Sequence, residues 1–286
     1  MSNFESVTDA RDRLAAAGYL SDDRIATAVF LADRLEKPLL VEGPAGVGKT
    51  ELAKAVRASI GADLIRLQCY EGLDEARALY EWNYKKQLLR IQAASGGQTW
   101  ADLSEDVFGE EFLLTRPLLT AIRSDRPTVL LIDETDKADV EMEGLLLEVL
   151  SDFQVTVPEL GTIAATRRPF VVLTSNATRE LSEALRRRCL YLHMDYPTPQ
   201  REREIVRARV PEVEERLAEQ VVAAVAALRT LDLRKPPSIA ETIDWARTLT
   251  ALDRHELDPQ AAADTLGVVL KHAADQRRAA EALRLP

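Results

Sequence analysis

Residues 43–51 of the chain read Gly43-Pro44-Ala45-Gly46-Val47-Gly48-Lys49-Thr50-Glu51. The first eight match the pattern G-x-x-x-x-G-K-[ST] in full. An apolar run at residues 37–42 precedes them, and residues 51–57 carry helix formers with apolar side chains at helical spacing. A strand, a glycine-rich loop and a helix are the context that this pattern requires. The stretch therefore predicts a loop that binds the phosphates of a nucleoside triphosphate.

The residue types in this loop suit that chemistry. Glycines let several backbone N–H groups converge on phosphate oxygens, and the N-terminus of the following helix adds partial positive charge. Lys49 is expected to contact the β- and γ-phosphates, and the Thr50 hydroxyl is expected to bind Mg²⁺. We therefore expect ATP and Mg²⁺ as ligands. The candidate nucleotide-binding residues in the loop are Gly43, Pro44, Ala45, Gly46, Val47, Gly48, Lys49, Thr50 and Glu51.

Length and composition are those of a globular protein. The chain has 286 residues, 46% of them hydrophobic and 29% charged, which is enough for one large domain or two modest ones. The net charge of −10 disfavours a general nucleic-acid surface. We see no apolar run long enough to span a membrane and no signal peptide, so a cytoplasmic protein is expected. Two distant cysteines and three scattered histidines give no disulfide framework and no zinc spacing.

Strand and helix patterns alternate along the first two thirds of the chain. Four further apolar runs predict strands at residues 63–69, 128–132, 170–174 and 190–194. Helices are expected at residues 7–17 and 22–35, a helical insertion at residues 70–127 with a loop tip at residues 95–98, and a β-hairpin at residues 154–163. A Pro-rich break after Tyr196 separates this part from alanine- and arginine-rich helices. The fold class is therefore α/β, with a core at residues 1–196 and an all-α lid at residues 197–286.

Two carboxylates directly follow the predicted strand at residues 128–132. Asp133, at the strand end, is well placed to hold Mg²⁺ through water near the phosphate-binding loop. Glu134 is then expected to orient and deprotonate the attacking water. Two solvated carboxylates in a turn are the alternative for this pair.

Two further positions are candidates for catalysis. Asn176 follows the strand at residues 170–174, where its amide would hold the hydrolytic water or a γ-phosphate oxygen, unless it only forms a turn.

The second candidate is the run Arg186-Arg187-Arg188, which lies directly before a predicted buried strand. Guanidinium groups there need an anionic partner and would stabilise charge on a transferring phosphoryl group, also in a neighbouring subunit. A solvated basic helix end is the alternative for one or two of the three.

The order and spacing of these features resemble those of AAA+ ATPases. The phosphate-binding loop, the Asp133-Glu134 strand end, Asn176 and the arginine run correspond to Walker A, Walker B, sensor 1 and the arginine finger. Within that group the chain resembles the MoxR family, on the stretches VEGPAGVGKTE (residues 41–51), DETDKA (133–138), LEVL (147–150) and QVTV (154–157). The stretches QCYEGLDE (68–75) and LYEWNY (79–84) are similar to the branch associated with carbon monoxide dehydrogenase maturation.

The resemblance implies a fold, an assembly and partners. It implies a five-stranded parallel sheet between helices, with a helical lid. It also implies a homo-oligomeric ring, commonly a hexamer, with ATP at the subunit boundaries. Arg188 aligns best with the finger, with Arg187 and Arg186 as substitutes. Members act like chaperones on client metalloenzymes, often with a partner protein that carries a von Willebrand factor A domain. No nucleic-acid partner and no membrane span are expected.

The lid departs from the resemblance at one position. Where related lids offer an arginine after Ser-Pro, this chain reads Pro237-Ser238-Ile239-Ala240-Glu241, so the sensor 2 arginine is absent there. Either Arg247, about two turns further on, replaces it, or the lid is coupled to the nucleotide in a different way.

Two other classes of function remain as alternatives. The first is a DNA-associated AAA+ motor of the clamp-loader or branch-migration type, which the acidic balance disfavours. The second is a nucleotide-gated binding switch with little turnover, which the Asp133-Glu134 pair disfavours.

Overall fold

The computed structural model describes residues 2–93 and 107–283. The loop tip predicted at residues 95–98 lies outside these residues. The chain forms two compact units. The first comprises Met1–Glu42 and Thr50–His193, and the second comprises Gly43–Lys49 and Met194–Pro286.

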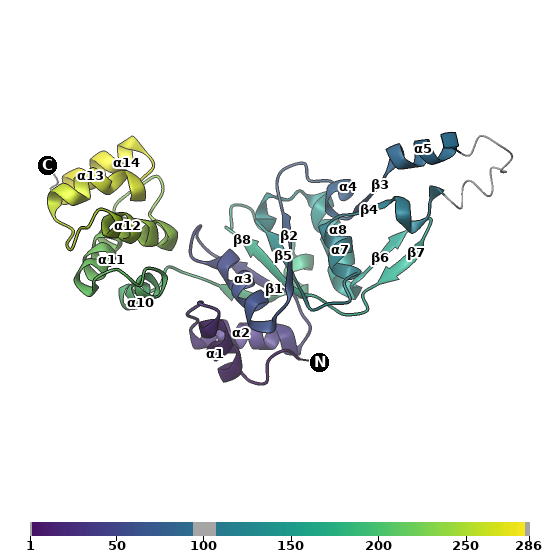
Figure 1. Ribbon diagram of the computed structural model, residues 1–286, viewed down its shortest axis with the longest axis horizontal. Coiled ribbons are helices and arrows are strands. Elements are labelled where there is room, and N and C mark those ends of the chain that lie inside the picture. The colour runs from purple at the N-terminus through teal and green to yellow at the C-terminus, as the bar shows by residue number, and fades with distance from the viewer. Residues whose placement is uncertain (1, 94–106, 284–286) are drawn as a thin grey trace. The chain divides into compact units, whose positions relative to one another are not determined.

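A five-stranded parallel sheet forms the centre of the first unit (Figure 1). Its order is β2-β5-β8-β1-β9, and the strand bounds are Leu39–Glu42 (β1), Asp63–Gln68 (β2), Thr128–Asp133 (β5), Phe170–Ser175 (β8) and Leu190–His193 (β9). Every residue of β1, β5 and β8 is buried, because helices and loops cover both faces of the central strands. The α/β class and the five predicted strands are confirmed.

The expectation that the strand after the arginines is buried was wrong. β9 lies at the edge of the sheet, and only Leu192 of its four residues is buried. A strand at the sheet edge has a neighbour on one side only, so apolar content alone does not bury it. The strand therefore gives no reason why all three arginines should need an anionic partner.

The helices predicted at residues 7–17 and 22–35 and after the phosphate-binding loop are present as α1, α2 and α3. Asp22 caps α2, and Asp139 caps α8, each by accepting a hydrogen bond from a backbone N–H in the first helical turn. On one face of the sheet, Leu40, Leu130 and Val171 join a core with apolar side chains of α7 and α8. The helices of this region are α1 (Val7–Ala16), α2 (Asp23–Arg34), α3 (Lys49–Ile60), α7 (Pro117–Ile122), α8 (Val140–Asp152) and α9 (Glu183–Arg188).

The insertion contains a small sheet that the sequence did not predict. Strands β3 (Tyr80–Trp82) and β4 (Leu113–Thr115) pair antiparallel, and the Trp82 ring meets the Phe108 ring edge-on at 5.4 Å. Three-residue strands are too short for the alternation that reveals a strand in a sequence. The other described elements here are α4 (Glu75–Ala78), α5 (Tyr84–Ala93) and the short helix η1 (Glu110–Phe112). The predicted β-hairpin is confirmed as β6 (Gln154–Val157) and β7 (Gly161–Ala164), after the short helix η2 (Thr135–Lys137).

Residues 194–283 form helices and no strand. They are α10 (Pro199–Arg209), α11 (Glu215–Arg229), α12 (Ile239–Ala251), α13 (Pro259–Val269) and α14 (Ala273–Leu283). Glu202, 1% exposed at its side chain, accepts two hydrogen bonds from the Arg229 guanidinium at 2.6 and 2.8 Å and one from the Thr242 hydroxyl. A buried carboxylate that is bidentately paired in this way fixes α10 against α11 and α12. None of the helices in the described part of the chain is long and apolar enough to cross a bilayer.

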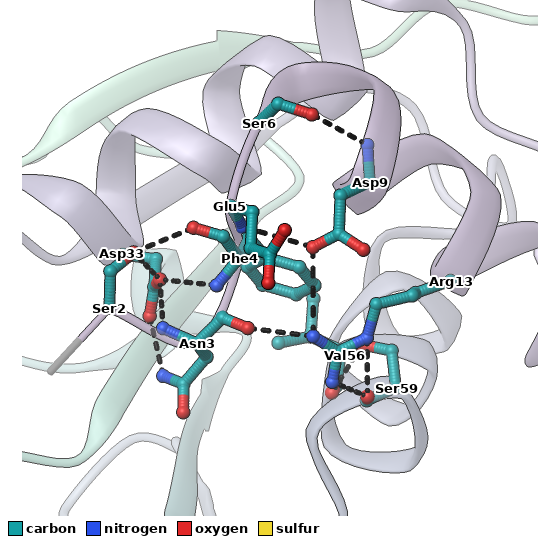
Figure 2. A network of polar contacts seen from close by, with 10 residues as sticks. All are labelled: Ser2, Asn3, Phe4, Glu5, Ser6, Asp9, Arg13, Asp33, Val56 and Ser59. Atoms are coloured by element: carbon teal, nitrogen blue, oxygen red, sulfur yellow. Dashed lines mark hydrogen bonds and ion pairs between the residues drawn. The ribbon is translucent and has the colours of Figure 1, made fainter.

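A polar network holds the N-terminal segment against α1, α2 and α3 of the first unit (Figure 2). Asp33, on α2, accepts hydrogen bonds from the Ser2 hydroxyl and from the backbone N–H groups of Asn3 and Phe4, at 2.7, 2.6 and 3.1 Å. Arg13, on α1, donates to the carbonyl oxygens of Asn3 and Ser59, and its guanidinium lies 5.1 Å from the centroid of the buried Phe4 ring. The network therefore joins the N-terminus to the C-terminal end of α3.

We expect Asp33→Ala to lower the free energy of unfolding by about 2 kcal/mol, because buried donors lose their acceptor. Urea denaturation measures this change as a shift of the midpoint. The matched control is Asp12→Ala, since Asp12 is exposed and its ion pair with Arg11 spans 3.6 Å. The control should stay within about 0.5 kcal/mol of the native protein. Equal midpoints for the two variants would contradict the role assigned to Asp33.

Candidate active site

The phosphate-binding loop runs from the end of β1 to the start of α3. Gly46 and Gly48 have φ angles of 74° and 102°, a region that glycine adopts without strain. A Cβ atom on Gly46 would strike the side chain of Ser238, which caps α12. Lys49 is buried, and its Nζ donates to the carbonyl oxygens of Gly43 and Pro44, both at 2.7 Å. The loop is therefore a closely packed turn, and no residue larger than glycine fits at position 46.

Thr50 and Asp133 lie side by side in the first unit. The Thr50 hydroxyl, in the first turn of α3, donates to Asp133 Oδ1 at 3.1 Å. Asp133 is the last residue of β5 and is buried. A hydroxyl and a carboxylate are hard oxygen ligands of the kind that Mg²⁺ prefers. The donor set therefore fits Mg²⁺, which Thr50 and Asp133 would hold.

Glu134 follows Asp133 in an unusual backbone conformation. Its φ and ψ angles are 55° and 48°, in the left-handed region that residues other than glycine seldom adopt. Its N–H donates to the Thr174 hydroxyl at 3.0 Å, and its carboxylate Oε2 accepts a hydrogen bond from Gln68 Nε2 at 3.1 Å. Such strain is characteristic of functional sites, and here it directs a carboxylate away from the line of the strand.

Sequence reasoning missed three residues that hold these carboxylates. Thr174, on β8, donates to Asp133 and accepts from the Glu134 backbone. Arg66, on β2, pairs with Asp133 at 2.5 Å, and Gln68 holds Glu134. Arg66 and Gln68 are polar residues two apart at the end of a strand, so they lie on one face of it. That spacing was the available signal, and the pairing of Gln68 with Asp133 in the strand register brings it to the site.

Asn176 lies just beyond the end of β8, as predicted. Its backbone N–H donates to Asp136 Oδ1 at 3.2 Å. Asp136 also accepts from the backbone N–H and the hydroxyl of Thr178. Burial alone would raise the pKa of Asp136, but these hydrogen bonds outweigh it and hold the pKa below its ordinary value. A charged Asp136 therefore fixes the turn that carries Asn176.

The three arginines on α9 have different environments. Arg186 pairs with the buried carboxylate of Glu42 at 3.4 Å. Arg188 is exposed, and its Nε donates to the Ser151 hydroxyl at 2.6 Å. Arg187 is exposed as well. Neither Arg186 nor Arg188 bonds to Thr50, Asp133 or Glu134 within the described residues, so the structure brings those three together but not the arginines.

The position at which related lids carry the sensor 2 arginine is the N-terminus of α12 in this chain. Ser238 and Glu241 form a capping box, in which Ser238 N–H donates to Glu241 Oε2 at 2.8 Å. Glu241 therefore closes the helix end with its own side chain. Arg247 lies on the same helix, where it donates to the Arg209 carbonyl at 3.3 Å and approaches Asp244 at 3.7 Å. These contacts occupy Arg247 within the lid.

Neither cysteine is suited to nucleophilic chemistry. Cys69 and Cys189 are both free thiols. Burial raises the pKa of each to about 12, and the negative charge of Asp133 adds to the effect at Cys69. A thiol with such a pKa stays protonated at neutral pH and is a weak nucleophile.

Comparisons with known proteins agree with this geometry. Residues 39–194 match the family model "ATPase family associated with various cellular activities (AAA)". An uncharacterized protein, SH1500, of Staphylococcus haemolyticus is 25% identical over 244 residues, which are 81% of this chain and 85% of that protein. The chaperone protein ClpB of Corynebacterium glutamicum is 30% identical over 181 residues, 61% of this chain but only 19% of ClpB.

A solved structure supports the fold. A point mutant of RuvB from Thermotoga maritima has a TM-score of 0.51 and 16% sequence identity, with 99% of this chain and 74% of that chain covered. At this identity the likeness speaks for the fold alone. The family model, by contrast, spans the sheet, the phosphate-binding loop and the Asp133-Glu134 strand end. The chain therefore belongs to the ATPase family associated with various cellular activities (AAA).

Proposed function

We propose that this ATPase couples ATP hydrolysis to chaperone-like remodelling of a client protein, with Glu134 as the base that activates water. The observation that carries the hydrolysis part of the proposal is the position of the Glu134 carboxylate. Glu134 follows directly after Asp133, and its backbone is in the left-handed conformation. Its carboxylate accepts a hydrogen bond from Gln68 Nε2 at 3.1 Å. A carboxylate that is oriented by a neighbouring amide can accept a proton from water at a fixed point.

The remaining roles follow from the same motifs. Lys49 would bind the β- and γ-phosphates, and Asn176 would act as sensor 1 on a γ-phosphate oxygen or the water. Thr50 and Asp133 would hold Mg²⁺, which neutralises charge on the β- and γ-phosphates when it is bound. Arg66 pairs with Asp133 Oδ2 at 2.5 Å, which holds the carboxylate in place beside the phosphate-binding loop.

The remodelling role is supported by the kind of relative and by the family resemblance. ClpB, a chaperone by name, is 30% identical over its matched part, although the chain spans only about a fifth of its length. The resemblance to the MoxR family narrows the role to maturation, or metal-cofactor insertion, of a client metalloenzyme such as a carbon monoxide dehydrogenase-like molybdenum enzyme. A hexameric ring, a partner with a von Willebrand factor A domain and a cytoplasmic location belong to the same proposal.

A captured partner tests this proposal. Glu134→Gln protein loaded with ATP is immobilised and incubated with lysate, because a subunit that binds but does not hydrolyse ATP holds its client. Lys49→Ala is the matched control, since it should not bind ATP. We expect a metalloenzyme or a von Willebrand factor A protein to be retained only by the first variant and to be released by the native protein with ATP. Retention of DNA alone would favour the motor alternative and contradict the maturation role.

A further inference from the structure

Glu42 is a buried carboxylate that joins three different elements. It is the last residue of β1, and its side chain is 8% exposed. Its carboxylate accepts hydrogen bonds from the Tyr191 hydroxyl of β9 at 2.9 Å and from the Ser175 hydroxyl of β8 at 3.2 Å. Arg186 of α9 lies 3.4 Å from each of its oxygens. A charge in the middle of a buried sheet is costly unless it is paired, so these contacts depend on each other.

Arg186 is fixed from two sides. Besides the pair with Glu42, its guanidinium lies 5.1 Å from the centroid of the Tyr191 ring, a distance that suits a cation–π contact. Burial and the hydrogen bond to Glu42 raise the pKa of Tyr191, which keeps its hydroxyl a donor to the carboxylate. Arg186 is therefore an anchor of α9 rather than a free cation.

Helix α9 needs such an anchor. It has six residues, too few for a helix to be stable without tertiary contacts. Its first turn is held by Glu143, which accepts from the Ser182 backbone N–H at 2.9 Å. Its last turn is held by the ion pair between Arg186 and Glu42. Consecutive residues in a helix point about 100° apart, so fixing Arg186 inward sets the directions of Arg187 and Arg188.

We infer that Glu42 is a positioning residue for the arginine finger: by holding Arg186, it orients the arginines that complete the nucleotide site of a neighbouring subunit. This inference rests on the proposed ATPase function and on the expectation, from the family resemblance, that an arginine of α9 acts in trans. It divides the arginine run into one anchor, Arg186, and two outward-facing candidates for the finger. It also explains why a strand that leads into the phosphate-binding loop ends in a buried charge.

Mixed rings test the inference. A donor subunit carries Lys49→Ala, which cannot bind ATP but keeps its arginines, and an acceptor subunit carries Arg188→Ala, which keeps its own ATP site. In the parent mixture, hydrolysis arises only where a donor faces an acceptor. Glu42→Gln is then added to the donor or to the acceptor in separate mixtures. In the donor we expect it to lower phosphate release about tenfold, because a misplaced catalytic group costs at least that much.

The direction of the effect separates positioning from general damage. Glu42→Gln should lower phosphate release at least about five times more in the donor than in the acceptor, because the acceptor already lacks the Arg188 finger that Glu42 would position. Arg186→Gln in the donor should reproduce the loss, and it provides a second test if Glu42→Gln fails to fold. The control is Glu36→Gln, since Glu36 and Arg168 form an exposed pair at 3.3 Å. It should change the rate by less than about twofold in either subunit.

Two results would overturn the inference, and they differ. Equal losses in donor and acceptor, with an active parent mixture, would show that Glu42 does not act through the finger. No hydrolysis in the parent mixture would overturn the action in trans, and with it the positioning role.

Discussion

Glu134→Gln protein is expected to bind ATP as the native protein does and to hydrolyse it about 10²- to 10⁴-fold more slowly. The amide has the shape of the carboxylate, so the hydrogen bond with Gln68 can persist after an amide rotation. An amide cannot accept the proton of the attacking water, whereas Thr50, Asp133 and Lys49 are untouched. Steady-state phosphate release measures kcat, and titration with a fluorescent ATP analogue measures binding.

Two further variants make this expectation specific. Lys49→Ala should lose binding as well as turnover, because the cation that faces the phosphates is gone. Glu141→Gln removes an exposed carboxylate on α8 and should leave both quantities as in the native protein. Native turnover in Glu134→Gln would mean that another group is the base. Loss of binding in that variant would instead place Glu134 among the groups that hold the nucleotide.

The sheet could be predicted from the sequence because its strands carry local signals. The apolar runs of β1, β5 and β8 are buried on both faces, so every position favours an apolar side chain. Polar residues follow the apolar runs of β5 and β8 and mark the end of the sheet where Asp133, Glu134 and Asn176 lie. Motif and context agree at the phosphate-binding loop, so that stretch predicted nucleotide binding, whereas the fold class followed from the alternation of strand and helix patterns along the chain.

The supporting residues could not be predicted because their roles depend on strand register. Arg66 and Thr174 meet at Asp133 although they are 108 positions apart, and each belongs to a different neighbour of β5. Likewise, Glu42 appears in the sequence as one acidic residue before a glycine loop. Its partners come from β8, β9 and α9, more than 130 residues away. The spacing of Arg66 and Gln68 indicates one face of a strand, but a single sequence does not show which distant residues that face meets.

Arg188→Ala subunits are expected to bind ATP normally and to hydrolyse it about 10³-fold more slowly, as when a finger is removed from a phosphoryl-transfer site. The Arg188 guanidinium is exposed, and two hydrogen bonds hold it, to the Ser151 hydroxyl and to the Ala184 carbonyl oxygen. Both lie at the surface, where water can replace them when the side chain turns toward a neighbouring subunit. Phosphate release by the variant alone gives the loss. Arg187→Ala, which removes the adjacent exposed arginine, should cost less if Arg188 is the finger.

Mixing Arg188→Ala with Lys49→Ala subunits should restore part of the activity, and the ratio predicts how much. In a ring with head-to-tail interfaces, an interface is productive only when a Lys49→Ala subunit donates to an Arg188→Ala subunit. Random assembly at equal amounts makes about one quarter of the interfaces productive, and any other ratio makes fewer. Phosphate release should therefore pass through a maximum at equal amounts, near one quarter of the native rate. A flat profile at every ratio would contradict action in trans, because neither variant then completes the site of the other.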